Sequence, residues 1–230
     1  MSHTFHPEVE PHHLRIDVDA YDDAYVVGDA HGCPEPFDRL LETLNVADDD
    51  LVVLVGDLVR KGPDSAAVVE RVREAENVFS VRGNNEEKLL RGEKSLPELS
   101  AADLEWIASL PVAISVGGTL VVHGGVDPRK PLSDHTIDDL QTTRSLAPGG
   151  SYDPPYWYEE YTGPPQVCFG HTVLDAPVVT EWAVGLDTGC VYGGSLTAFD
   201  LRRGTTTAVP ARRDGVDRNE SKIAPSTCSD

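Results

Sequence analysis

Short apolar runs alternate with amphipathic stretches along the N-terminal part of the chain. The runs at 24–27 and 51–55 are continuously apolar, and 78–81 is apolar except for Ser80, which is typical of strands buried on both faces. Between them, apolar residues recur at helical spacing over 35–44 and 64–75. The order strand–helix–strand–helix–strand predicts a parallel sheet in an α/β fold.

The pattern changes in the second half of the chain. After a short helix expected over 86–90, two apolar runs at 112–116 and 120–122 flank the pair Gly117-Gly118. Paired runs separated by a glycine turn predict a β-hairpin. Short strands are expected over 166–209, so a mixed or second sheet should follow the parallel one.

Each of five predicted strands is followed at once by polar residues beside glycine. These residues are Asp29 and His31, Asp57, Asn84, His123 and His171. The carboxyl ends of neighbouring strands in open α/β sheets meet at one crevice, so we expect these side chains to gather there. Singly, each has a structural explanation: Asp29 is a candidate helix N-cap, and each histidine a candidate core or turn residue. Together they supply two carboxylates, three imidazoles and an amide, a donor set that suits Mn, Fe or Zn and also admits Mg.

Five ordered segments identify a family resemblance. The segments GDAHG, GDLVRKG, RGNNE, VHGG and FGHT resemble the calcineurin-like metallophosphoesterases, in the branch of the phosphoprotein phosphatases and symmetrical diadenosine tetraphosphatases. The closing segment LDTGCVYGGSLTAF is similar to the tetraphosphatases, and the resemblance covers about Tyr25 to Leu201. It implies an α/β fold that is a four-layer α/β/β/α sandwich with two mixed β-sheets.

The resemblance also implies a ligand set for two divalent metal ions, with Mn favoured and Fe, Zn or Mg possible. Asp29 and His31 would bind the first ion, and Asp57 would bridge both. Asn84, His123 and His171 would complete the ligand set of the second ion. In such a centre a metal-bridged hydroxide attacks phosphorus while the cations neutralise the phosphoryl oxygens.

Three basic residues are candidates for holding the substrate phosphate. Lys61 and Arg82 lie beside metal motifs, and Arg144 resembles a second phosphate-binding arginine of the family. The family commonly has Arg at the position of Lys61, and Lys offers a point charge in place of a bidentate fork. Arg144 has the alternative of being a solvated loop residue. The aromatic stretch 152–161 would either roof the site and stack on a nucleobase or pack between the sheets, and packing is favoured.

The sequence departs from the family pattern at two linked positions. Family members usually have a proton-donating His at the position of Asn85 and an Asp that orients it at the position of Arg60. An amide cannot donate a proton near neutral pH, so a rate contribution of roughly 10²–10⁴ is at risk. Our hypothesis is that Arg60 supplies positive charge instead, which favours anhydrides and activated esters. The alternative is that Arg60 is an ordinary surface residue.

These observations predict a metal-dependent hydrolase of phosphate esters or anhydrides, with a preference for nucleotide polyphosphates such as diadenosine tetraphosphate. A protein serine/threonine phosphatase is the alternative enzyme, so the partner is a phosphorylated small molecule or a phosphoprotein. A catalytically silent metal-binding regulatory module is the alternative of another class. Loss of the acid pair favours that module, whereas a complete ligand set argues against it.

Length and composition bound these hypotheses without choosing among them. The 230 residues suit one domain, expected over 15–210, with flexible tails at 1–14 and 211–230. A net charge of −20 with few lysines makes nucleic acid or an anionic membrane an unsuitable partner. Such a surface resembles halophilic proteins, although an acidic mesophilic protein is the alternative. The four cysteines lack CxxC spacing, and the polar N-terminus without an apolar span leaves the cytoplasm as the expected location.

Overall fold

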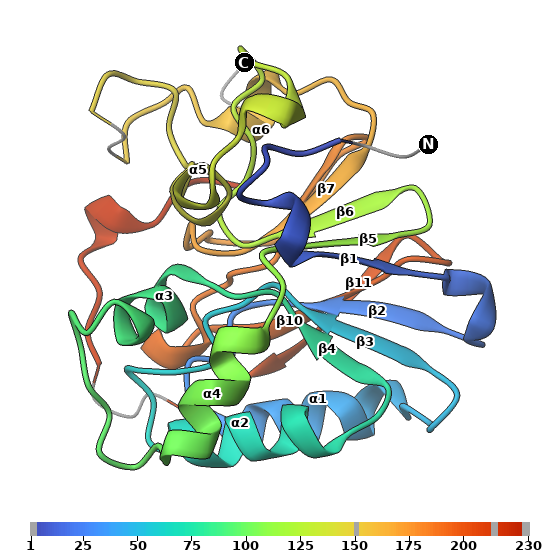
Figure 1. The fold of residues 1–230 in the computed structure, drawn as a ribbon, viewed down its shortest axis with the longest axis vertical. Coiled ribbons are helices and arrows are strands. Elements are labelled where there is room, and N and C mark those ends of the chain that lie inside the picture. The colour runs from blue at the N-terminus through green and yellow to red at the C-terminus, as the bar shows by residue number, and fades with distance from the viewer. Residues whose placement is uncertain (1–3, 150–151, 213–215, 227–230) are drawn as a thin grey trace.

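The computed structural model describes residues 4–149, 152–212 and 216–226, which form two β-sheets packed face to face (Figure 1). One sheet has five strands in the order β11-β10-β2-β3-β4. Strands β2, β3 and β4 are parallel, whereas β10 runs antiparallel to both β2 and β11. The strands are β2 (Ala24–Val27), β3 (Leu51–Leu54), β4 (Val78–Ser80), β10 (Ser195–Asp200) and β11 (Thr205–Pro210).

The other sheet has six strands in the order β1-β5-β6-β7-β9-β8 and is also mixed. Strands β5 and β6 form the predicted antiparallel hairpin, and β6, β7 and β9 are parallel. Strand β1 pairs parallel with β5, and β8 pairs antiparallel with β9. The strands are β1 (His13–Ile16), β5 (Ala113–Val116), β6 (Thr119–Val122), β7 (Gln166–Phe169), β8 (Val178–Val179) and β9 (Ala183–Gly185).

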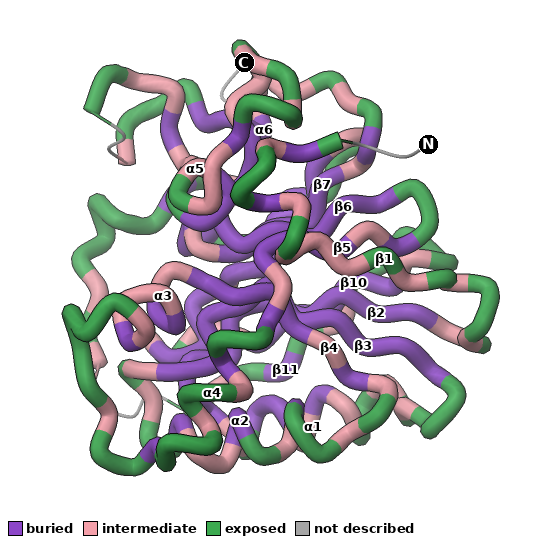
Figure 2. The backbone as a smooth tube through the Cα atoms, in the orientation of Figure 1, coloured by how far each residue is buried: buried purple, intermediate pink, exposed green. Residues whose placement is uncertain are grey.

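Helices cover the outer face of each sheet, and Figure 2 shows that their outward sides are exposed. Residues of α1, α2 and α4 pack in one apolar cluster with the five-stranded sheet, and residues of α5 and α6 pack in another with the six-stranded sheet. The helices are α1 (Pro34–Leu44), α2 (Ser65–Glu74), α3 (Asn84–Leu90), α4 (Ala101–Ser109), α5 (Ile137–Thr142) and α6 (Trp157–Glu160). The fold is therefore the expected four-layer α/β/β/α arrangement.

Burial of both faces explains why β2 and β3 are continuously apolar. In β3, Val52 and Leu54 point into the cluster beneath the helices, whereas Leu51 and Val53 point into the cluster between the sheets. The flanking helices are set by local signals: the Asp64 side chain accepts a 2.9 Å hydrogen bond from Ala67 N at the start of α2. Helix α1 ends where Asn45 adopts a left-handed conformation.

The terminal segments, for which flexible tails at 1–14 and 211–230 are the prediction, contribute three buried residues to the core. Phe5 and Val9 are buried in the cluster beneath α5 and α6, because a sheet face and two short helices leave apolar surface for them to cover. Ala224 is fully buried in the same cluster. The described parts of the two segments thus contribute side chains to the core, whereas 1–3, 213–215 and 227–230 lie outside the described residues. Across the described part of the chain, no helix has the length and apolar character needed to span a bilayer.

Candidate metal centre

The predicted ligand residues come from corresponding ends of the two sheets. Asp29, Asp57 and Asn84 follow the parallel strands β2, β3 and β4 of the five-stranded sheet. His123 and His171 follow the parallel strands β6 and β7 of the six-stranded sheet. Because the sheets are stacked, side chains from both strand ends meet at one edge of the sandwich.

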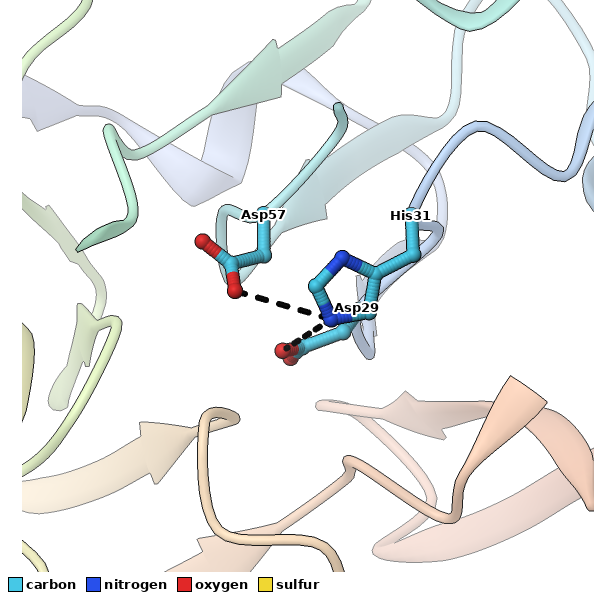
Figure 3. Close-up of side chains that lie close together, drawn as sticks. All are labelled: Asp29, His31 and Asp57. Atoms are coloured by element: carbon cyan, nitrogen blue, oxygen red, sulfur yellow. Dashed lines mark ion pairs between the residues drawn. The ribbon is translucent and has the colours of Figure 1, made fainter. Parts of the chain in front are cut away.

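Asp29, His31 and Asp57 point toward one another in Figure 3. His31 Nε2 lies 3.8 Å from Asp29 Oδ2 and 3.6 Å from Asp57 Oδ2. Each residue offers a ligand atom, and these atoms lie within 4.8 Å of one another. All three residues are buried. This arrangement is suited to holding one metal ion.

The remaining candidates gather on the other side of Asp57. His123 Nε2 lies 3.3 Å from Asp57 Oδ1 and 3.2 Å from Asn84 Oδ1. The rings of His123 and His171 have their centres 5.1 Å apart. Asp57 thus turns one carboxylate oxygen toward His31 and the other toward His123, as a bridging ligand requires.

The turns that carry these side chains are conformationally unusual. Six non-glycine residues among the described residues have a positive φ: His31, Asn45, Asp57, Arg60, Lys61 and His171. All except Asn45 belong to the candidate site. Left-handed backbone at non-glycine residues carries strain and clusters at functional sites, so this distribution supports a functional role for the edge.

Neighbouring backbone groups orient the candidate ligands. His31 Nδ1 lies 3.2 Å from Val59 O and His123 Nδ1 lies 2.9 Å from Val55 O, so each Nδ1 donates to a carbonyl and each Nε2 faces the candidate centre. The carboxylate of Glu86 accepts hydrogen bonds from the backbone N–H groups of Asp57, Val59 and Gly83. These contacts fix the turn that carries Asp57.

Charge and burial act together on the donor set. Burial lowers the pKa of His31 to about 3, which keeps its imidazole neutral. Burial would raise the pKa of Asp57, but His123 and His31 hold it well below its ordinary value. Burial opposes a charge on His123, yet contact with Asp57 raises its pKa to about 9, so a proton competes with any cation at that nitrogen. Buried carboxylates, imidazoles and an amide fit divalent transition metals.

A family model for calcineurin-like phosphoesterases matches residues 24–194, which include every candidate ligand. The chain belongs to this family. The resemblance inferred from the five ordered motifs is thereby confirmed. The prediction of a hydrolase of the metallophosphoesterase class is confirmed as well.

Relatives of this phosphoesterase include enzymes of both tetraphosphatase types. An asymmetrical bis(5'-nucleosyl)-tetraphosphatase of Geobacillus sp. (strain WCH70) is 27% identical over 81% of this chain and 93% of its own. A symmetrical bis(5'-nucleosyl)-tetraphosphatase of Acidovorax sp. (strain JS42) is 28% identical over 80% of this chain and 93% of its own.

Solved structures show the same fold. One provisionally described as a diadenosine tetraphosphatase has a TM-score of 0.78 and 30% identity, over 87% of this chain and 98% of its own. A protein serine/threonine phosphatase from Saccharomyces cerevisiae has a TM-score of 0.56 at 16% identity, over 90% of this chain and 85% of its own, which is a likeness of fold alone.

Two of the three predicted phosphate-binding residues of this phosphoesterase reach the metal centre. Lys61 Nζ lies 2.8 Å from His31 Nε2, and Arg144 Nη2 lies 2.6 Å from His171 Nε2. Arg82 does not reach it. Its guanidinium forms a 2.9 Å ion pair with Glu87 and donates to a helix α4 carbonyl, because its side chain leaves the strand end on the side of α4.

Arg60 and Asn85 form a continuous hydrogen-bonded chain to Asp57. The Arg60 guanidinium donates to Asn85 Oδ1, and Asn85 Nδ2 donates to Asp57 Oδ2. Asn85 N donates a further 2.8 Å bond to Asp57 Oδ1. Arg60 is therefore tied to the candidate bridging carboxylate of Asp57 through the Asn85 amide.

A cavity of about 360 Å³ opens over this centre and exposes residues that sequence reasoning missed. Among the lining residues, these are Lys88, Asp187 and Arg218. Asp187 follows β9 just as the other candidates follow their strands, so its position was a usable signal. Arg218 lies in a polar C-terminal segment, and nothing in its local sequence indicates a site.

The aromatic stretch 152–161 divides between the two expected roles. Tyr156, Trp157 and Tyr158 are buried in the apolar cluster on the outer face of the six-stranded sheet, not between the sheets. Tyr152 lines the cavity, where the guanidinium of Arg144 lies 4.1 Å from its ring centre. Packing was therefore the better expectation for most of the stretch.

Proposed function

We propose that this phosphoesterase hydrolyses dinucleoside polyphosphates such as diadenosine tetraphosphate. The observation that carries the proposal is the charge of the cavity, which five basic side chains line: Arg60, Lys61, Lys88, Arg144 and Arg218. None of the five is ion-paired with a carboxylate of the described residues. Basic residues elsewhere are commonly paired, as Arg71 is with Asp38. In a chain of 19 Lys and Arg against 39 Asp and Glu, such a cavity favours a ligand with several negative charges.

The proposed metal ligands form two sets that share one residue. Asp29, His31 and Asp57 would hold one divalent cation, and Asp57 with Asn84, His123 and His171 the other. Mixed oxygen and nitrogen donors make Mn²⁺ the favoured ion, with Fe, Zn or Mg as alternatives. When bound, such a pair supplies a water of lowered pKa as nucleophile and neutralises charge on the phosphoryl group. Lys61 and Arg144, which contact two of these ligands, are placed to bind phosphate oxygens beside them.

The Arg60–Asn85 pair favours a leaving group that needs no proton. Asn85 offers its N–H groups to Asp57 and its oxygen to Arg60, so both ends of the amide are engaged. A nucleotide released from a phosphoanhydride is stable as an anion. The positive charge of Arg60 is separated from the Asp57 carboxylate by the Asn85 side chain alone. A serine alkoxide is strongly basic and leaves poorly without a proton donor.

The test compares substrates on the purified chain with Mn²⁺ in high salt, which also suits the proposed halophilic surface. We expect kcat/KM for diadenosine tetraphosphate to exceed that for a phosphoserine peptide by at least about 100-fold, the lower bound for a missing general acid. Chromatography of the products distinguishes symmetrical from asymmetrical cleavage. A preference for the phosphopeptide would contradict the proposal and favour a protein phosphatase.

p-Nitrophenyl phosphate separates an enzyme from a silent metal-binding module, because its leaving group needs little help. Activity should disappear with a chelator and in Asp57→Asn. The matched control is Asp48→Asn, which removes the same charge from an exposed loop. A chain that binds Mn²⁺ but leaves this substrate intact is a binding module and not a hydrolase.

A further inference from the structure

The C-terminal segment 216–226 crosses the open edge of the sandwich and is anchored beside a candidate metal ligand. In Figure 1 this segment, in red, runs past α3 toward the upper half of the molecule. Ala224 N donates a 2.8 Å hydrogen bond to Val173 O, and Asp175 N donates a 3.1 Å bond to Ala224 O. Val173 lies two residues after His171 and lines the cavity. The anchor therefore fixes the segment relative to the metal centre.

Arg218 projects from this segment into the cavity and is held by three neutral groups. Its Nη1 donates to Tyr192 Oη at 3.0 Å, and its Nη2 donates to Tyr152 Oη at 2.8 Å. Its Nε donates to Lys222 O at 2.8 Å. A guanidinium has five N–H groups in a fixed plane, so these three bonds orient it and leave one N–H on each terminal nitrogen.

Arg218 forms no ion pair with a carboxylate among the described residues, although Asp187 lines the same cavity. Exposed arginines of the chain show the contrast: Arg203 pairs with Asp23 and Asp200, and Arg129 pairs with Asp127. The guanidinium carbon of Arg218 instead lies 4.9 Å from the ring centre of Tyr192. Lys61 Nζ lies 5.5 Å from the same ring centre, so both cations contact Tyr192. An oriented guanidinium with two N–H groups left over and no carboxylate bonded to it is a built site for phosphate oxygens.

We propose that Arg218 binds the phosphate groups of the substrate that lie beyond the phosphoryl group at the metal centre. It thereby selects chains of several phosphates over single phosphates. The inference rests on the proposed function for its substrate class and deepens it by naming a specificity residue outside the metal ligands. Phosphate binding breaks no ion pair at Arg218, so the binding free energy gained is not offset by the loss of an ion pair within the protein.

The test uses Arg218→Ala in the full chain, with Lys222→Ala as a matched control. Lys222 is exposed in the same segment, and its replacement removes the same charge while keeping the backbone carbonyl that Arg218 contacts. The readout is inhibition of p-nitrophenyl phosphate hydrolysis by inorganic tripolyphosphate and by orthophosphate, with free Mn²⁺ held constant. We expect Arg218→Ala to raise the inhibition constant of tripolyphosphate by about tenfold to a hundredfold, the range for a charged hydrogen bond.

The same variant should weaken orthophosphate inhibition by less than about twofold, since Arg218 is assigned no contact with the phosphoryl group at the metals. The control Lys222→Ala, which lies outside the cavity lining, should leave the basal kcat/KM and both inhibition constants unchanged. Arg218→Lys, which keeps the charge but not the fork, should give an intermediate tripolyphosphate constant. Equal weakening of both inhibitors, or no change for either, would overturn the inference.

These readouts stay informative if diadenosine tetraphosphate is not a substrate. A chain that hydrolyses p-nitrophenyl phosphate but not the dinucleotide refutes the proposed function, while tripolyphosphate inhibition still tests Arg218. If the chain proves catalytically silent, calorimetric titration of the Mn²⁺-loaded protein with tripolyphosphate replaces inhibition. Equal affinity in Arg218→Ala and Lys222→Ala would then refute the role of Arg218.

Discussion

Gly170 is the residue through which the packing of the metal centre can be tested most directly. A Cβ at this position would lie 2.6 Å from Val55 Cγ2 and 3.0 Å from Asp29 Cγ, and closer still to Asp29 Oδ1. Unstrained contacts between carbon atoms are about 3.5–4.0 Å, so the Asp29 carboxylate must retreat by roughly 0.5 Å or more. Metal–ligand distances tolerate only about 0.2 Å. Gly170→Ala should therefore disturb the centre without removing a single polar atom.

We expect Gly170→Ala to weaken Mn²⁺ binding by at least about tenfold, the loss seen when partners of metal ligands are removed. Overpacking should also lower the free energy of unfolding by about 1–3 kcal/mol. The assays are Mn²⁺ dependence of p-nitrophenyl phosphate hydrolysis, bound metal after gel filtration, and thermal unfolding with chelator present. Gly118→Ala is the control, because a Cβ there meets nothing within 4 Å. An unchanged Mn²⁺ requirement in Gly170→Ala would refute the assignment of Asp29 as a ligand.

Two further predictions concern buried polar groups. Glu86→Gln replaces one of the two carboxylate oxygens that accept hydrogen bonds from three backbone N–H groups. It should lower the free energy of unfolding, measured by denaturant titration, by about 1–3 kcal/mol. The control Glu98→Gln, at an exposed position, should leave that free energy almost unchanged. His135 is fully buried, and burial lowers its pKa, while its Nε2 accepts a hydrogen bond from Asp127 N. A depressed histidine pKa means that stability is complete above the unfolded value near 6.5 and is lost as pH falls toward the folded value. Unfolding free energy should thus fall more steeply from pH 7 to 5 in the native chain than in His135→Gln, and parallel curves would contradict this.

The gathering of the candidate ligands at one edge was predictable because these residues obey a rule of topology. Asp29 and Asp57 each follow a continuously apolar run, and parallel strands bring such positions to one edge whatever the loops do. The order of strands along the sequence is therefore enough to predict that these polar side chains share one edge of the sheet. The same rule covers Asp187 after β9, a residue that the motif pattern alone did not single out.

Side chains whose direction depends on tertiary contacts were not predictable. Arg82 lies beside a metal motif in the sequence, but its side chain pairs with Glu87. The position of Glu87 depends on where helix α3 begins. Arg218 is far from every motif in sequence and reaches the cavity because Ala224 pairs with the loop after His171. Strand β1 was missed because His13–Ile16 is only half apolar and lies at the edge of its sheet.

The acidic surface and the basic cavity are compatible because electrostatic interactions have different ranges in salt. Remote surface carboxylates repel a polyphosphate only over about a Debye length, which falls from roughly 8 Å at physiological ionic strength to about 3 Å at 1 M. Hydrogen-bonded contacts to Arg144 or Arg218 act at less than 3 Å or so and are screened far less. High salt therefore removes the repulsion that the net charge of −20 imposes while it leaves the contacts of the cavity in place. A chain of this composition can therefore bind a strongly anionic substrate in a cavity that is lined by basic side chains without ion pairs among the described residues.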